Sequence, residues 1–259
     1  MNIYFNCLKG IVYKELIRFF KQKSRFFSAL IRPLLWLCIF SIGLKPSLEL
    51  ILTSPYEKAV DYETYIIPGL VGMVILFNGM QSSLTMIFDR EMGSMKILLA
   101  SYINRNYLIF CKMFATSIVS TIQALTFLIV ARIYGIEISF FAIILTVPLI
   151  ILSSIILNAF ALFLSSVIKE LENFASVMNF VIFPMFFLSS ALYPLSQIKE
   201  ASFLIYKISC FNPFTYMIEA IRHSLYFQID MYSLLILFCS FIVSLVIAFL
   251  GFKVKKVNK

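Results

Sequence analysis

The single histidine of the chain, His223, is the first residue that could do chemistry. Glu219 and Arg222 precede it by four residues and by one, so the three side chains would form a cluster on a helix. One interpretation is a catalytic or metal-binding role, although one histidine excludes a multi-histidine metal centre and leaves any triad dependent on His223. We favour the other interpretation, an interfacial helix whose charged pairs neutralise one another.

The motifs of common enzymes are absent from the sequence. It contains no Gly-x-Ser-x-Gly nucleophile elbow and no glycine-rich phosphate loop that ends in Gly-Lys-Ser or Gly-Lys-Thr. The five cysteines are scattered, and no two of them have the spacing of metal ligands or of a redox pair. We therefore predict that the chain is not an enzyme and binds no metal or cofactor itself.

The elements that position these residues must lie in a membrane. Of 259 residues, 61% are hydrophobic and only 14% are charged. A soluble domain has about half apolar and about a quarter charged residues. The chain has too little polar surface to cover a soluble fold, and we expect an all-α polytopic membrane protein with a single transmembrane domain.

Six runs of the chain are long and apolar enough to be membrane spans. A helix needs about 20 mostly apolar residues to cross a bilayer. The fourth run is longer than one crossing requires and contains Pro148, which predicts a tilt or a kink. The six runs are 26–44, 64–88, 107–131, 138–168, 174–195 and 231–252.

Lysine and arginine are distributed unequally between the two sides of these runs. Most of them lie before the first run, between the second and third, and in the C-terminal tail. Since such residues favour the cytoplasmic side, we predict that both termini are cytoplasmic and that the chain resides in the cytoplasmic (inner) membrane. The net charge of +9 is then explained by membrane orientation and by contact with lipid, so we predict no nucleic-acid partner.

The first 25 residues predict an amphipathic helix that lies on the membrane surface. Apolar residues from Phe5 to Phe19 recur on one helical face, opposite a stripe of basic residues. Such a helix lies at the headgroup boundary with its basic side toward anionic lipid. The alternative is that these charges only determine topology. The stripe consists of Lys14, Arg18, Lys21 and Arg25.

The connection after the second run combines charges with a short apolar face. From Phe88 to Ser101 it reads Phe-Asp-Arg-Glu-Met-Gly-Ser-Met-Lys-Ile-Leu-Leu-Ala-Ser, with apolar residues at helical spacing. A segment of this length cannot span a membrane, but it could dock into a groove on a cytoplasmic partner. The alternative is a solvated loop.

This connection resembles the coupling region of the type-2 permease family of ATP-binding-cassette (ABC) transporters. Four further stretches resemble that family in the same order, although Tyr102 stands where the family commonly has proline. Pro33–Phe40 resembles the family's first span, and Tyr65–Gly69 resembles the entry to its second. Phe183–Pro194 resembles the fifth span with the following turn, and Asn212–Arg222 resembles the external segment before the last span.

The resemblance implies two permease copies, as a homodimer, that work with two copies of a separate ATPase, on which ATP and magnesium bind. The ATPase would receive the coupling segment 89–104, and segment 196–230 would form external helices that re-enter the membrane. The implied coupling residues are Asp89, Arg90, Glu91, Gly93, Ser94, Met95, Leu98, Leu99 and Ser101. The external segment includes Asn212, Pro213, Glu219, Arg222 and His223.

Polar residues within the predicted spans have two interpretations. They could line a transport pathway, because polar groups avoid lipid, or they could hydrogen-bond one helix to another. No charged residue is near the centre of a predicted span, and Arg32 is close enough to the cytoplasmic end for its side chain to reach the interface. The pathway candidates are Asn78, Gln81, Ser82, Asn158 and Asn179.

The low charge of the spans disfavours an ion-coupled secondary transporter, which would require a buried titratable group. We expect instead the permease subunit of an ABC exporter for a bulky amphipathic or hydrophobic molecule, such as a drug, a lipid or a lipid-linked compound. The main alternative is a polysaccharide or oligosaccharide exporter of the same family.

Overall fold

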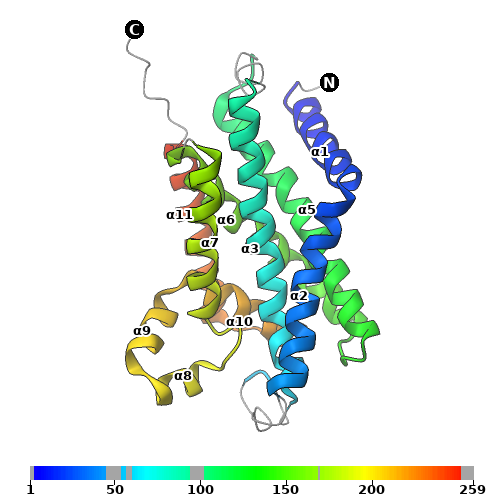
Figure 1. Cartoon of the computed structure of the whole chain (residues 1–259), viewed down its shortest axis with the longest axis vertical. Coiled ribbons are helices and arrows are strands. Elements are labelled where there is room, and N and C mark those ends of the chain that lie inside the picture. The colour runs from blue at the N-terminus through cyan, green and yellow to red at the C-terminus, as the bar shows by residue number, and fades with distance from the viewer. Residues whose placement is uncertain (1–2, 45–53, 57–59, 94–101, 169, 252–259) are drawn as a thin grey trace.

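The computed structural model describes residues 3–44, 54–56, 60–93, 102–168 and 170–251. This part of the chain forms ten helices and contains no strand (Figure 1). Their bounds are α1 Ile3–Lys21, α2 Lys23–Leu44, α3 Tyr62–Glu91, α5 Arg105–Ile133, α6 Phe140–Val167, α7 Leu171–Phe187, α8 Leu195–Ala201, α9 Phe203–Phe211, α10 Pro213–Leu225 and α11 Met231–Gly251.

Helix α3 is the centre of the bundle. It packs against α6, α5, α2 and α7, and its buried residues lie on all sides. The apolar stretch of α3 is buried to a larger share than that of α5, α6 or α11, so other helices and not lipid surround it. α2 and α7 flank α3 on the side that faces the viewer in Figure 1, with α5, α6 and α11 behind. α3 therefore connects the contacts at one end of the bundle with those at the other.

Four of the six predicted spans correspond to helices that are long and apolar enough to cross a membrane. These helices are α3, α5, α6 and α11. The first predicted span lies in α2, whose apolar stretch is Leu30–Ile39, and the fifth begins in α7, which has 17 residues. A count of six crossings stays a prediction for these two helices.

Helix α7 ends at Phe187, eight residues before the end of the predicted run 174–195. The next residues form a buried turn, in which Ser189 Oγ donates to the Phe186 carbonyl at 2.6 Å and accepts from the Ala191 N–H at 3.2 Å. Hydropathy alone did not reveal this turn, because it continues an apolar run and its residues 189–192 are buried like those of a helix.

Helix α1 packs along α5. The Tyr107 hydroxyl of α5 donates to the Tyr4 carbonyl at 2.9 Å, and the rings of these two tyrosines meet edge to face at 5.0 Å. α1 buries Glu15 and Phe19, whereas Phe5, predicted to share the apolar face, is 62% exposed. The face that packs therefore includes an acidic residue and is not the purely apolar one that was predicted.

The predicted external segment 196–230 contains three short helices. α10 packs against α6, α11 and α3, whereas α8 and α9 contact each other and project from the bundle (Figure 1). Asn212 caps α10 by accepting from the Phe214 N–H at 3.1 Å, and Pro213 occupies the first helical position. Both residue types favour a helix start, which explains where α10 begins.

Candidate functional site

Four charged residues from three helices form an ion cluster at the end of the bundle predicted to be cytoplasmic. Lys112 Nζ of α5 lies 2.6 Å from Glu15 Oε1 of α1 and 3.7 Å from Asp89 Oδ2 of α3. Arg18 Nη1 of α1 lies 3.3 Å from the same Asp89 oxygen. We call Glu15, Arg18, Asp89 and Lys112 the α1 ion cluster.

The α1 ion cluster is largely withdrawn from solvent. The side chains of Glu15 and Lys112 are only 7% and 14% exposed, so each charge depends on its partner for compensation. Two acidic and two basic groups balance one another. The cluster therefore fixes α1 to α5 and to the end of α3 from which the predicted coupling segment continues.

Arg90, the residue after Asp89, binds the end of α6. Its Nη1 donates to the Ser165 carbonyl at 3.1 Å and its Nη2 to the Ile168 carbonyl at 2.9 Å. The last carbonyls of a helix have no partner within it, and a cation there also matches the helix dipole. Arg90 thus connects α3 to α6.

The predicted coupling residues fall into three groups. Asp89 and Arg90 point into the bundle, whereas Glu91 is exposed at the end of α3. Gly93 follows with φ of +74°, a backbone conformation that glycine adopts without strain. The role of these residues in coupling stays a prediction. The others lie outside the described residues: Ser94, Met95, Leu98, Leu99 and Ser101.

The basic stripe predicted on α1 does not present a single surface. Lys14 and Lys21 are exposed, as a lipid-facing role requires. Arg18 instead turns toward Asp89. The side chain of Arg25 is outside the part that the structure describes.

The five pathway candidates also divide. Asn78 of α3 donates to Gln123 Oε1 of α5, and Asn158 Nδ2 of α6 donates to the Ser154 carbonyl at 2.7 Å and to Ser117 Oγ at 3.3 Å. Ser82 is buried in the same region. Asn78 and Asn158 therefore bond one helix to another. The remaining two candidates differ: Gln81 is partly exposed and Asn179 is exposed.

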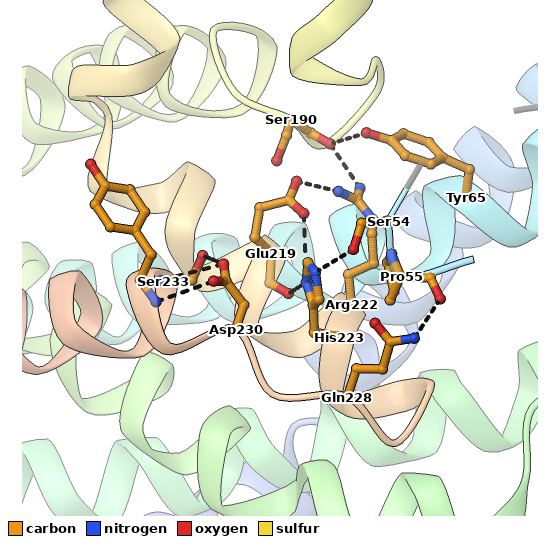
Figure 2. Close-up of polar contacts among 11 residues, drawn as sticks. Ser54, Pro55, Tyr65, Ser190, Glu219, Arg222, His223, Gln228, Asp230 and Ser233 are labelled. Atoms are coloured by element: carbon orange, nitrogen blue, oxygen red, sulfur yellow. Dashed lines mark hydrogen bonds and ion pairs between the residues drawn. The ribbon is translucent and has the colours of Figure 1, made fainter. Parts of the chain in front are cut away.

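A second polar cluster lies at the opposite end of the bundle and is centred on Arg222 (Figure 2). Arg222 is 1% exposed. It donates to the Glu219 carboxylate and, at 2.9 Å, to the Ser190 carbonyl, while its guanidinium carbon lies 4.0 Å from the centre of the Tyr65 ring. The Tyr65 hydroxyl donates to the same carbonyl at 3.0 Å. Arg222 thus connects α10, α3 and the turn after α7.

His223 completes the cluster predicted from the sequence. Its Nδ1 is 2.9 Å from the Glu219 carbonyl and 3.9 Å from the Glu219 carboxylate, and its Nε2 is 3.2 Å from Ser54 Oγ. A hydrolytic triad requires the acid to orient the histidine, whereas this carboxylate pairs with Arg222. The geometry favours a structural cluster.

The loop before α3 packs on this cluster. Tyr56 is buried, its ring meets that of Tyr226 at 4.7 Å, and Gln228 Nε2 donates to the Pro55 carbonyl at 3.1 Å. Burial raises the pKa of Tyr56 to about 12, although the nearby Arg222 charge acts in the opposite direction. Tyr56 therefore stays protonated at physiological pH.

Asn212 connects two helices through one side chain. While its Oδ1 caps α10, its Nδ2 donates to the Met185 and Leu188 carbonyls, both at 2.8 Å. These carbonyls belong to the end of α7 and the turn that follows.

Replacement of Asn212 by serine should separate these two roles. Serine retains a capping oxygen but leaves both carbonyls unpaired, so we expect a loss of about 1–3 kcal/mol in the free energy of unfolding. Alanine also removes the cap and should cost about 1 kcal/mol more. Thermal unfolding of the purified variants in detergent measures both losses. A serine variant as stable as the wild type would contradict the connecting role.

Sequence reasoning missed several members of these clusters. Glu15 is the only acidic residue among the first 25, and this isolation within a basic segment was an available signal. Lys112 lies within the predicted run 107–131, and its partners on α1 and α3 are 97 and 23 residues away. No local pattern indicates Gln123 or Tyr65, because their partners lie 45 and 125 residues away.

Residues 7–226 match the family described as ABC-2 type transporter. The chain belongs to this family. Two relatives bear the name transport permease ycf38. The one from Cyanophora paradoxa is 27% identical over 217 residues, which cover 82% of this chain and 71% of the relative. The one from Porphyra purpurea is 24% identical over 219 residues, which cover 83% and 72%.

The chain is therefore a membrane permease subunit of the ABC-2 type. Permeases of this family generally work with an ATPase partner. In the permease, the α1 ion cluster and Arg90 lie next to the segment that resembles the coupling region, and the Arg222 cluster lies at the other end of α3.

Proposed function

We propose that the permease forms the translocation pathway of an exporter driven by ATP hydrolysis on a separate subunit. Two permease copies would assemble as a homodimer with two ATPase copies, which bind ATP and magnesium. The cargo would be a bulky amphipathic or hydrophobic molecule. Both termini would face the cytoplasm, and the protein would reside in the inner membrane.

The observation that carries this proposal is the family match over residues 7–226, combined with the contacts beside the coupling region. Asp89 and Arg90 bind three other helices, so a displacement at the end of α3 would move α1, α5 and α6 together. A nucleotide can drive transport only if it interacts differently with two permease states. The coupling segment and the end of α3 would transmit that difference.

In this mechanism the exposed Glu91 is available to the ATPase, whereas Asp89 and Arg90 hold the helix end in place. Residues 93–101, which we expect to form the docking helix, would bind in a groove on the ATPase. Closure of the ATPase subunits on ATP would displace the two coupling segments and open the pathway outward.

Charge reversal at Glu91 tests the proposal. A lysine there would place a charge of opposite sign in the interface, and we expect the amount of co-purified ATPase and the transport rate to fall by about fivefold or more. Glu91 is exposed and makes no ion pair within the described residues, so the permease itself should remain as stable as the wild type.

The matched control is Glu200→Lys, because Glu200 is also exposed but lies on α8 at the opposite end. We expect this variant to retain both the ATPase and transport. If Glu91→Lys retains both as well, the assignment of the coupling region is wrong.

A further inference from the structure

Arg32 is a charged residue on an otherwise apolar, exposed side of α2. It is exposed, as are the nearby Ile31 (50%), Leu35 (55%) and Ile39 (62%). Its guanidinium carbon lies 3.9 Å from the centre of the Phe77 ring. Phe77 is near the middle of α3, which runs from Tyr62 to Glu91. The charge therefore lies halfway along α3, whereas the sequence predicted a side chain directed to the cytoplasmic interface.

The Arg32 guanidinium makes neither an ion pair nor a hydrogen bond with the residues that the structure describes. The stacked ring of Phe77 is its one interaction there. Arg18, Lys112 and Arg222, in contrast, all pair with carboxylates. The five N–H donors of Arg32 are thus available to a ligand.

Arg32 does not stand alone on this side of the bundle. Gln81, one turn along α3 from Phe77, is partly exposed, and Asn179 of α7 is exposed. Trp36 of α2 contacts Phe186 and Phe187 of α7, with ring centres 6.4 and 5.9 Å apart. Trp36 is therefore at the level of Phe186 and Phe187. Arg32 is about one turn before Trp36 and Asn179 about two turns before Phe186, so Asn179 lies within about one helical turn of the level of Arg32.

We call the side formed by Arg32, Phe77, Gln81 and Asn179 the α2–α7 face. An arginine in the hydrocarbon region is costly, and such residues face a water-filled cavity or the interior of a bundle. Two amides at nearly the same level add to the cost of contact with lipid tails. The polar side chains of the α2–α7 face are therefore suited to a polar group of a ligand and not to lipid tails.

We propose that Arg32 binds an anionic group of the transported molecule on the α2–α7 face. A planar guanidinium can hold a carboxylate, phosphate or sulfate through two parallel hydrogen bonds. Phe77 supports the guanidinium from one side, and the apolar part of the ligand would contact Ile31, Leu35 and Phe180, which is 79% exposed. The inference rests on the proposed function and narrows its cargo to anionic amphiphiles.

Trp36 provides a specific probe of this site. It is the only tryptophan of the chain and lies one helical turn from Arg32. The permease would be reconstituted in phosphatidylcholine nanodiscs and titrated with dodecyl phosphate that carries a dinitrophenyl quencher. Dodecanol with the same quencher is the uncharged reference. Quenching of Trp36 fluorescence then reports binding near Arg32.

We expect the phosphate to reach half-maximal quenching at a concentration about tenfold or more below that of the alcohol, because a charge-assisted pair strengthens binding by at least this factor. Arg32→Gln should abolish the difference, and Arg32→Lys should retain part of it. Lys9→Gln, which removes an exposed charge on α1 outside the basic stripe, should leave it unchanged.

Two results would overturn the proposal. One is an undiminished preference for the phosphate in Arg32→Gln. The other is loss of the preference when the nanodiscs contain phosphatidylglycerol, which would identify a lipid headgroup as the anion that Arg32 binds. The titration uses neither ATP nor the ATPase, so its failure is separate from a failure of the Glu91 experiment.

Discussion

Replacement of Gly69 by valine is expected to prevent most of the permease from folding. A Cβ atom at this position in α3 would approach the Ala191 Cα and carbonyl carbon to 2.8 and 2.9 Å and would overlap the carbonyl oxygen. These are backbone atoms of the turn after α7, which Ser189 and Asn212 hold in place. The contact cannot be relieved by rotation of a side chain, so we expect a cost of about 3 kcal/mol or more.

The yield of monodisperse protein after detergent extraction, together with its thermal unfolding, measures this effect. Gly79→Ala is the matched control, since Gly79 lies in the same helix and its added Cβ would make ordinary contacts at 3.5 Å. Alanine is the better helix former by about 1 kcal/mol, so this variant should be as stable as the wild type or more stable. Normal yield and stability of Gly69→Val would refute the close approach of α3 and the turn.

Replacement of Arg222 by methionine is expected to cost about 3–5 kcal/mol in the free energy of unfolding, because it leaves Glu219 as an uncompensated charge. The Glu219 side chain is only 16% exposed, so water can replace little of the lost interaction. The same substitution removes the hydrogen bond to the Ser190 carbonyl and the contact with the Tyr65 ring.

The double variant Glu219→Gln, Arg222→Met tests this cause directly. It removes both charges together, and a buried pair replaced in this way is far less destabilising than one broken pair. We expect the thermal unfolding midpoint to recover at least half of the loss seen in Arg222→Met. Equal midpoints of the single and double variants would show that unpaired charge is not the cause.

The helices of the bundle were largely predictable because the signal for each is local. Apolar runs of at least 20 residues identified α3, α5, α6 and α11, and the predicted limits of α3 and α5 differ from the observed ones by two or three residues. Asn212 followed by Pro213 indicates the start of α10 from the properties of the two residues alone.

The end of α7 was not predictable in this way. It depends on Asn212, which binds two carbonyls 24 and 27 residues earlier in the chain, and on the close packing of Ala191 against Gly69. Residues 189–192 of the turn are buried for these reasons although their backbone is not helical. Hydropathy cannot distinguish a buried turn from a buried helix.

The charged residues likewise have properties that the sequence predicts and contacts that it does not. Their positions along the chain predicted orientation and a coupling segment, and they placed Glu219, Arg222 and His223 on one helical turn. They did not show that Asp89 pairs with Arg18 and Lys112, which are 71 and 23 positions away. Nor did they show that the Arg32 guanidinium stacks on the Phe77 ring.

Membrane character and family therefore follow from the order of residues alone, because hydrophobicity adds up along a helix and a family pattern lies in successive positions. Only the tertiary structure decides which charges are compensated and which polar side chains bond one helix to another. An ion pair or a close backbone contact depends on how two helices are placed side by side, and that placement results from the packing of the whole bundle. The clearest consequence is the contrast between Arg222, which pairs with Glu219, and Arg32, which has no ion pair with the residues that the structure describes.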